Sequence, residues 1–421
     1  MSKCLILLTY LYPFDKSEPF LENEIKYLDK FDHIYIVPCS LKKECKQTRN
    51  LPNDKYEILD MSFDELKFVS LFKWVLWAVY SLFTKPFWSD MGYIIKSRKQ
   101  ILKRTISLIR FVAYAERKDH KVIGLLEKQG ISKYDEVVIY SYWLHNFAYI
   151  GIKLKNWLEN KKPVKTVSRA HRYDIYDYSN NINYLPLRKY LLRNLNNIYP
   201  ISYDGTEYLK NRYPEYRRKI RVQRLGTIDH GIKPIQKSSP LRIVSCSNLI
   251  PVKRVNLIIE ALSLIDDIPI CWTHLGFGPL QQDLEELARA KIKSNVTVEF
   301  KGYTPNVKVL EFYKHTPVHL FINTSENEGV PVSIMEAISF GIPAIATDVG
   351  GSREIILDGV NGYLLEKNFD VGQLADLIRK FANMPEDKYA KLCRNARSIW
   401  ERKYNADKNY KKFVNLIYKA V

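Results

Sequence analysis

The residues best suited to chemistry form one short stretch in the last third of the chain. Glu328-Gly329-Val330-Pro331 begins a helix-like pattern, and Glu336 follows Glu328 by eight residues. Proline is favoured in the first turn of a helix, and glycine lets a ligand approach the backbone closely. Free N–H groups at a helix start bind anions, so we expect a diphosphate there. The two carboxylates would then contact two different hydroxyl-bearing parts of that ligand, a sugar and a ribose.

Short apolar runs alternate with amphipathic stretches along the whole chain. This alternation indicates α/β structure with parallel sheets covered by helices on both faces. About twelve strands would overfill one open sheet, so we predict two doubly wound domains. The predicted strands are residues 4–8, 34–37, 136–140, 165–168, 198–202, 220–223, 242–246, 270–275, 296–300, 320–323, 344–347 and 362–365, and helical patterns cover residues 255–265, 280–290, 332–339 and 371–382.

A polar segment rich in proline, glycine and serine, residues 229–240, marks the expected boundary between the domains. The 421 residues, 46% of them hydrophobic, suffice for two such cores. The six cysteines are scattered without a C-x-x-C pair, which argues against a disulfide framework or a zinc site. The apolar run after Met1 is too short for a signal peptide, and no run of 18 uncharged apolar residues could span a membrane.

The formal net charge of +19 lies mostly in the first half, where residues 1–230 carry +15 and residues 231–421 carry +4. Residues 66–83 are dense in aromatics and contain two lysines, and a basic cluster follows at Lys96, Arg98, Lys99, Lys103 and Arg104. Such a pairing is typical of interfacial membrane helices. A core helix of the first domain is an equally good interpretation of residues 66–83. The basic stretch 212–224 favours a solvated helix end leading into a strand, or else a nucleic-acid contact.

The motifs around the glutamate pair resemble those of the retaining glycosyltransferases of family 4. The resemblance lies in E-G-x-P with the second glutamate, in the G-x-P-x-[IV]-x-[ST]-x-x-G-G run of residues 341–351, and in residues 245–262, 274–280 and 354–362. A looser likeness in residues 10–25, 168–174 and 225–227 is to the members that assemble bacterial exopolysaccharide, capsule or lipopolysaccharide. The resemblance implies the GT-B architecture, two Rossmann-like domains facing a cleft. It also implies an acceptor-binding domain at residues 1–230, a nucleotide-sugar domain at residues 231–404, and a final helix, residues 405–421, that returns to the first domain.

The resemblance also implies a role for individual residues. Lys253 would neutralise the donor diphosphate as it leaves, and Glu336 would hold the ribose hydroxyls. Glu328 would lie close to the donor sugar, and His171 would approach that sugar from the first domain. Asp174 would orient His171 or meet the acceptor. The backbone cradle of the donor is expected at Gly276, Gly329, Val330 and Pro331.

The chain departs from the family pattern at Asn248 and in its first-strand loop. Asn248 stands where an arginine often shares the diphosphate charge, and Arg254 is expected to compensate. The first-strand loop is not glycine-rich, so Lys16 or Glu18 would contact the acceptor rather than the donor phosphate.

His145 follows a predicted strand at the edge where ligands of open α/β sheets bind, and it is a further acceptor candidate. His315 and His319 flank Pro317, which breaks the helix that a metal pair would need, so we expect no metal and no cofactor.

The expected activity is retaining, metal-independent transfer of a sugar from a nucleotide-diphosphate sugar to a saccharide hydroxyl, on a lipid-linked intermediate in cell-surface polysaccharide synthesis. The enzyme would be cytoplasmic and peripheral on the inner face of the plasma membrane, with an anionic membrane surface but no nucleic acid as partner. A nucleotide-sugar epimerase or phosphorylase on the same scaffold is one alternative. A basic membrane- or nucleic-acid-binding adaptor without catalysis is another. Donor sugar, nucleotide, acceptor linkage and oligomeric state stay open.

Overall fold

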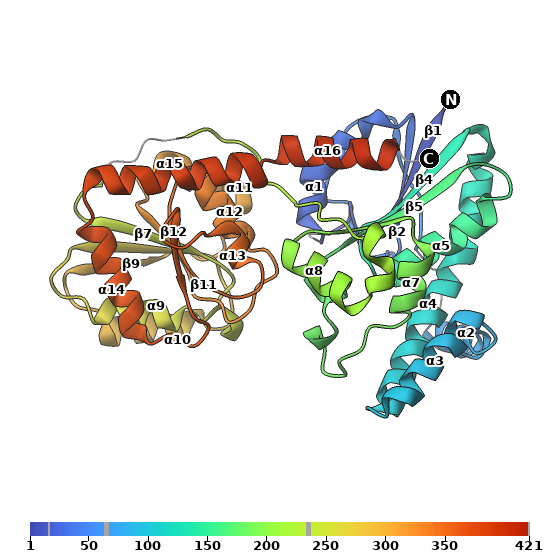
Figure 1. Ribbon diagram of the computed structural model, residues 1–421, viewed down its shortest axis with the longest axis horizontal. Helices are drawn as coiled ribbons and strands as arrows, with labels where there is room; N and C mark the ends of the chain where they lie inside the picture. Colours follow the sequence, from blue (N-terminus) through green and yellow to red (C-terminus); the bar gives the residue numbers. More distant parts are fainter. Residues whose placement is uncertain (16, 63–66, 233–236, 420–421) are drawn as a thin grey trace. The chain divides into compact units, whose positions relative to one another are not determined.

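The computed structural model describes residues 1–15, 17–62, 67–232 and 237–419, and the side chains of residues 67–73 lie outside this description. The chain divides into two units (Figure 1), the first formed by Met1–Arg224 with Tyr410–Val421 and the second by Leu225–Asn409. The sequence placed these divisions at residues 231 and 405. Lys16, Leu66 and residues 233–236 are outside the described residues.

The first unit is built on a six-stranded parallel sheet with the strand order β3-β2-β1-β4-β5-β6. This is the Rossmann order, in which the chain starts in the middle and winds outward in both directions. Its strands are β1 (Lys3–Thr9), β2 (His33–Pro38), β3 (Tyr56–Ile58), β4 (Glu136–Ser141), β5 (Val164–Ala170) and β6 (Asn197–Pro200). Its helices are α1 (Pro19–Ile25), α2 (Lys67–Ser81), α3 (Lys85–Ser97), α4 (Ile101–Lys128), α5 (Asn146–Leu158), α6 (Arg172–Ile175), α7 (Arg188–Asn194), α8 (Tyr203–Arg212) and, crossing back from the second unit, α16 (Ala406–Tyr418).

The second unit repeats this topology in the order β12-β11-β10-β7-β8-β9. Its strands are β7 (Leu241–Cys246), β8 (Ile270–Leu275), β9 (Val296–Phe300), β10 (Leu320–Asn323), β11 (Ala344–Thr347) and β12 (Gly362–Leu365). Its helices are α9 (Asn256–Ser263), α10 (Gln281–Lys291), α11 (Asn306–His315), α12 (Val332–Ser339), α13 (Ser352–Ile355), α14 (Val371–Ala382) and α15 (Glu386–Lys403). Five of these strands have the bounds that the apolar runs predict, and β7 begins one residue earlier than predicted, at Leu241.

Two strand predictions in the first unit were wrong in detail. The predicted strand 198–202 is β6, which ends at Pro200, because Ser202 caps α8 and its Oγ accepts a hydrogen bond from the amide of Gly205 at 3.0 Å. The predicted strand 220–223 is reduced to one bridge between Ile198 and Ile220. The short edge strand β3 gave too weak a signal to be predicted.

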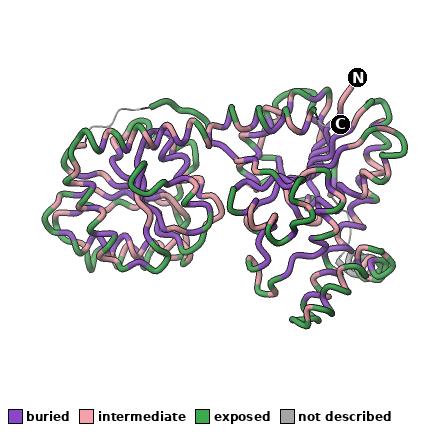
Figure 2. The backbone as a smooth tube through the Cα atoms, in the orientation of Figure 1, coloured by how far each residue is buried: buried purple, intermediate pink, exposed green. Residues whose placement is uncertain are grey.

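Both sheets are largely buried on their two faces, as Figure 2 shows by the purple segments inside each unit, whereas the edge strand β9 is exposed or half-buried at four of its five residues. Helix α16 covers part of the first sheet, where Phe413 and Ile417 join the core. Beneath it, Arg169 of β5 forms a fully buried ion pair with Glu24 of α1 at 2.9 Å, and its guanidinium carbon lies 3.9 Å from the Phe413 ring centroid. Among the described residues, no helix combines the length and apolar character needed to cross a membrane.

Candidate active site

The site in the second unit is organised by two loops that leave neighbouring strands at their carboxyl ends. Strands β7 and β10 are adjacent although β8 and β9 lie between them in sequence, so the strand order reverses direction at this point. Ligands of open α/β sheets bind outside the carboxyl ends of the strands at this switch point. The hydroxyl of Thr324 donates to the carbonyls of Lys253 and Arg254 at 3.1 and 3.0 Å, which joins the two loops.

The joined loops bring Lys253 and Glu328 into contact. Lys253 Nζ lies 2.6 Å from Glu328 Oε1, and the amide of Asn323 reaches the same oxygen at 3.4 Å. Their side chains are 22% and 11% exposed, so the pair lies at the surface of the loops and a ligand can reach it. A strongly anionic group placed here would compete with Glu328 for the ammonium of Lys253. The structure thus brings together the residues expected to neutralise the diphosphate and to face the sugar.

The glycine pair at residues 350 and 351 supports the loop that carries Glu328. A Cβ on Gly350, which has a φ of 54°, would lie 2.0 Å from the carbonyl oxygen of Glu328. A Cβ on Gly351 would lie 2.7 Å from the carbonyl oxygen of Gly329, which accepts a hydrogen bond from the Gly351 amide at 2.6 Å. Only glycine therefore lets this turn pack against the Glu328–Pro331 loop. Pro331 directly precedes α12 at its N-cap position and makes no side-chain capping bond, whereas the sequence placed it in the first turn.

Glu336 lies on α12 and is 7% exposed. Burial raises the pKa of its carboxyl group to about 7, and the hydrogen bond that Asn306 Nδ2 donates to Oε1 at 2.7 Å opposes that rise. Ionised Glu336 can accept hydrogen bonds from two adjacent hydroxyls, whereas the protonated acid accepts less well. The carboxyl group therefore changes charge state close to neutral pH.

The other residues expected to bind the donor differ in how far their side chains are already bonded within the protein. Arg254, in a left-handed conformation with φ of 48°, donates to the carbonyls of Thr324 at 2.8 Å and of Lys367 at 2.7 Å. These bonds engage its guanidinium in holding the β10 loop, which favours a positioning role. Asn248 is exposed on the loop after β7. At Gly276 a Cβ would lie 1.9 Å from the carbonyl oxygen of Ser247, so glycine is required where these loops meet.

His171 in the first unit follows β5 and precedes α6. It is 8% exposed, and its ring lies 4.8 Å from that of Tyr142 and 4.5 Å from that of Trp143. Neither ring nitrogen has a hydrogen-bond partner within the described part of the chain. Burial, aided by the charge of Arg169, lowers its pKa to about 3, so the imidazole is neutral and offers one donor and one acceptor.

Glu18, one of the residues expected to contact the acceptor, is bonded within the first unit instead. The Glu18 carboxylate accepts from the amides of Tyr10, Leu11 and Tyr12 and from Trp143 Nε1, all at 2.7–3.0 Å. These four bonds use its acceptor capacity and clamp the β1 loop to the β4 loop.

Asp174 is fully buried and accepts from the amides of His171 and Leu144, both at 2.6 Å. These two bonds fix the backbone of the His171 segment against the loop after β4. Burial raises its pKa to about 7. His145 contacts the ring of Phe111 at 4.9 Å, and burial lowers its pKa to about 4.

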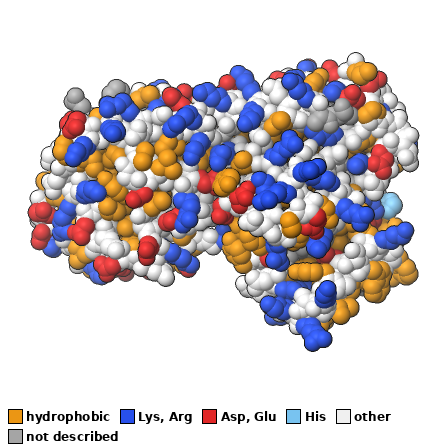
Figure 3. Space-filling model, in the orientation of Figure 1, with side chains coloured by type: hydrophobic (Ala, Val, Ile, Leu, Met, Phe, Trp, Pro, Cys, Tyr) orange, Lys and Arg blue, Asp and Glu red, His pale blue; other side chains and the backbone are white. Residues whose placement is uncertain are grey.

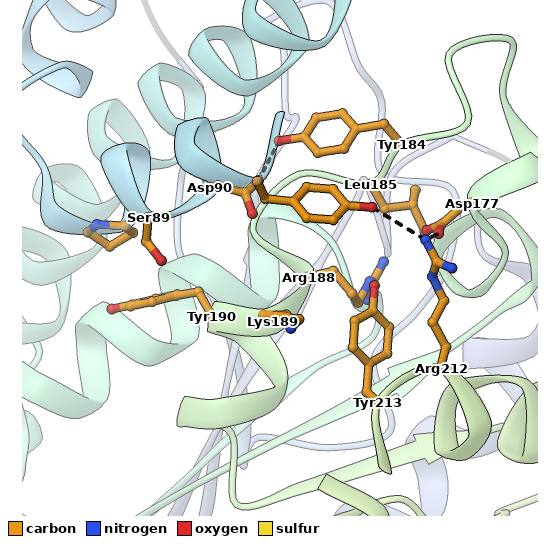
Figure 4. Close-up of a pocket in the computed structure, with 12 residues that line it drawn as sticks. Ser89, Asp90, Asp177, Tyr184, Leu185, Arg188, Lys189, Tyr190, Arg212 and Tyr213 are labelled. Atoms are coloured by element: carbon orange, nitrogen blue, oxygen red, sulfur yellow. Dashed lines mark hydrogen bonds and ion pairs between the residues drawn. The ribbon is translucent and has the colours of Figure 1, made fainter. Parts of the chain in front are cut away.

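A cavity of about 290 Å³ in the first unit was not predicted (Figure 4). Its walls come from α3, α7, the end of α8 and the segments between α6 and α7, and they combine apolar surfaces with charged groups of both signs. Arg212 pairs with Asp177 and donates to Tyr93 Oη at 3.4 Å. The lining residues are Pro86, Ser89, Asp90, Tyr93, Asp177, Tyr184, Leu185, Arg188, Lys189, Tyr190, Arg212 and Tyr213.

The cavity is tied to the His171 segment through Arg188. This buried guanidinium donates to the carbonyl of Leu144 at 3.0 Å and to that of Asp174, and its side chain lines the cavity. On the opposite wall, Asp90 accepts from the amide of Leu187 at 2.8 Å and from the Tyr184 hydroxyl. Burial raises the pKa of both Asp90 and Asp177. The cavity is at the small end of ligand pockets and would hold one sugar-sized group.

Sequence reasoning overlooked Asn306 and the cavity. Asn306 starts α11 shortly after the carboxyl end of β9, and a search for polar residues at strand ends would have found it. The cavity residues come from segments far apart in sequence that carry no motif. Among the described residues, no group of three or more His, Cys, Asp or Glu side chains gathers as metal ligands would. His319 is buried in the core and accepts from the amide of Arg242 at 2.9 Å.

Comparison with known proteins gives a family match within the second unit and relatives whose matches extend beyond it. Residues 231–399 match the model of the family "Glycosyl transferases group 1". The chain is 28% identical over 198 residues to a protein of Escherichia coli (strain K12) assigned as the colanic acid biosynthesis glycosyltransferase WcaL, a match that covers 45% of this chain and 48% of that protein. The WcaL protein of Salmonella typhimurium is 23% identical over 356 residues, or 78% of this chain and 84% of that protein.

Among solved structures, HepE of Anabaena in complex with UDP superposes with a TM-score of 0.59 over 99% of both chains, at 15% identity. A likeness at this identity bears on the fold alone. Together with the two Rossmann-type sheets, these findings confirm the expected fold class, α/β of the GT-B kind. The first match spans about half the length of its curated relative.

Proposed function

Because residues 231–399 match the glycosyl transferases group 1 family, we propose that the chain is a retaining glycosyltransferase, of the family 4 type, using a nucleotide-diphosphate sugar. The observation that carries the proposal is the contact of Lys253 with Glu328 at the sheet's switch point. An ammonium there offsets negative charge as it grows on a leaving diphosphate. We propose that this charge compensation replaces a metal ion.

The arriving diphosphate takes Lys253 from Glu328. The freed carboxylate then accepts hydrogen bonds from the donor sugar, and Glu336 accepts from the ribose hydroxyls. His171, with a neutral ring and two unengaged nitrogens, supplies a donor or acceptor to the sugar. The bond between the anomeric carbon and the diphosphate oxygen breaks, and the acceptor oxygen bonds to the same face of that carbon. The acceptor proton passes to the leaving phosphate oxygen, which balances the step without an enzymic nucleophile.

The acceptor in this proposal is a saccharide hydroxyl on a lipid-linked intermediate, in the synthesis of a cell-surface polysaccharide at the inner face of the plasma membrane. The colanic acid assignment of the two relatives supports the polysaccharide class. The cavity between α3 and α7 supports a saccharide acceptor, because tyrosine rings and Pro86 offer faces to C–H groups while Asp177, Arg212 and Ser89 offer partners to hydroxyls.

A thermal-shift screen of UDP-, GDP- and other nucleotide sugars, followed by transfer assays with the stabilising donor, tests this function. We expect one nucleotide class to raise the melting temperature, Glu328→Gln to lower the rate of transfer by about 10²–10³, and excess EDTA to leave the rate unchanged. Conversion of the donor into an isomeric nucleotide sugar without a saccharide acceptor would instead identify an epimerase. Loss of the rate in EDTA, restored by a divalent cation, would contradict the metal-independent step.

A further inference from the structure

One end of the first unit exposes a large apolar surface made by α2, α3 and the start of α4. We call this set of residues the α2–α4 surface. Its most exposed members are Phe83, Leu102 and Trp88, at 80%, 74% and 60%. Figure 3 shows orange side chains beside blue ones at the end of the unit where Figure 1 draws α2 and α3. The full set is Trp74, Val75, Leu76, Val79, Tyr80, Leu82, Phe83, Trp88, Ile95, Ile101, Leu102 and Ile106.

These side chains are not spare core residues, because the same helices bury other residues. Phe87 and Ile94 of α3 are 2% and 0% exposed, and the ring centroid of Trp77 on α2 lies 5.2 Å from that of His120 on α4. Trp88 turns its ring outward while its Nε1 donates to the carbonyl of Leu82 at 2.6 Å. The helices are thus apolar on a second face. Soluble monomers rarely expose an apolar surface of this size, so we expect a binding partner to cover it.

The charge around the α2–α4 surface is of one sign. Exposed cations border it at Lys85, Lys96, Arg98, Lys99 and Lys103. Asp90 is the single carboxylate in residues 67–110, and it turns into the cavity.

Arg104, which the sequence grouped with these cations, is only 3% exposed and donates to the carbonyls of Ile182 and Asn183. That grouping was wrong because tertiary contacts bury this guanidinium. The surface itself is bordered by the other five cations.

We propose that the α2–α4 surface docks on an anionic lipid bilayer. Apolar and aromatic side chains enter the headgroup boundary, and the bordering cations bind anionic headgroups. A second copy fits less well, because a symmetric interface would place each cationic border against its twin. In the second unit, by contrast, exposed apolar residues such as Leu264, Val307 and Val360 are far apart in the sequence and lie on different elements.

Helix α3 links this surface to the cavity. Trp88 and Ile95 lie on the exposed face, and Asp90 and Tyr93 line the cavity. Docking would therefore hold the cavity next to the headgroups, where a saccharide on a lipid carrier is presented. That consequence rests on the proposed function, whereas docking itself does not.

Sedimentation of the full chain with phosphatidylcholine vesicles, with and without phosphatidylglycerol, tests the proposal. We expect binding to the anionic vesicles that falls with added salt and little binding to neutral ones. Serine at Phe83, Ile95 and Leu102 together, and separately glutamine at the five bordering cations, should each weaken binding by at least about tenfold. Serine at Leu264, Val307 and Val360 is the matched control and should leave binding unchanged.

A second measurement keeps the test decisive if a variant folds poorly. Brominated lipids should quench the tryptophan fluorescence of the native chain, and Trp88→Phe should remove part of that quenching. Equal vesicle binding by the native chain and the serine variant would overturn the proposal. So would a native dimer without vesicle binding that the serine variant turns into monomers, since a second copy would then cover the surface. The assay needs no substrate, so its failure is separate from a failure of sugar transfer.

Discussion

Lys253 Nζ and Glu328 Oε1 lie 2.6 Å apart although 75 residues separate them in sequence. The contact follows from the strand order, because β7 and β10 are adjacent and the loops after them are joined by Thr324. An ion pair that is partly exposed adds little to stability. Its position at the switch point supports the proposed role instead, because an anionic ligand bound there would compete with Glu328 for the ammonium of Lys253.

Lys253→Ala should lower the rate of sugar transfer by about 10²–10³, the usual cost of losing one group that stabilises developing negative charge. Glu328→Gln should lower it by a similar factor, and neither change should move the melting temperature by more than a few degrees. The matched control is Lys367→Ala, which removes an exposed lysine paired with Glu326 at 3.1 Å on the same side of the sheet. Near-native turnover in either site variant would rule out these roles.

Donor binding should strengthen as the pH rises through about 7, because Glu336 must ionise to accept two ribose hydrogen bonds. Burial holds the folded-state pKa above its ordinary value, so the folded chain binds more protons than the unfolded chain between those two values. The same ionisation therefore lowers the free energy of unfolding as the pH rises across this window. Isothermal titration of the nucleotide against pH would show the rise, and Glu336→Gln should give weaker, pH-independent binding.

Asn306 provides an independent control of that titration. Its amide stabilises the ionised carboxylate, so Asn306→Ala should raise the pKa of Glu336 further and move the midpoint of donor binding to higher pH. The same variant at pH well above the midpoint should bind nearly as well as the native chain. A midpoint that stays in place would mean that another group titrates.

Gly350→Ala should weaken donor binding and transfer, because its Cβ would meet the Glu328 carbonyl at 2.0 Å and push the loop away. Gly359→Ala is the matched control, since Gly359 also has a positive φ, 69°, but no atom lies within 4 Å of its Cβ position. Both substitutions carry the strain of a left-handed alanine, about 1 kcal/mol. A difference in the donor Kd between them, at similar melting temperatures, isolates the clash; equal Kd values would contradict it.

The strands and loops of the second unit could be predicted from the sequence because their signals are local. The six strands of the second unit are short, largely apolar runs between turn residues, and the Gly-Val-Pro turn with the Gly-Gly turn marks the loops that meet. Roles that depend on distant backbone groups could not be predicted. Glu18 looks like an exposed loop acid, yet three amides and an indole surround it. Arg104 looks like part of a basic surface, yet it is held in the interior by hydrogen bonds to carbonyls nearly 80 residues away in sequence.

The cavity of the first unit should determine how well the acceptor binds. Tyr93 is 41% exposed and forms part of the wall, so Tyr93→Ala should preserve the fold while removing a ring face and a partner of Arg212. We expect the acceptor KM to rise by about tenfold, with the donor KM unchanged, because each good aromatic or polar contact contributes about 1 kcal/mol or more. Tyr203→Ala, at an exposed tyrosine on α8 outside the cavity lining, is the matched control and should leave both KM values unchanged. A change in the donor KM alone would mean that Tyr93 acts in donor binding rather than acceptor binding. No change in either KM would mean that the cavity does not bind the acceptor.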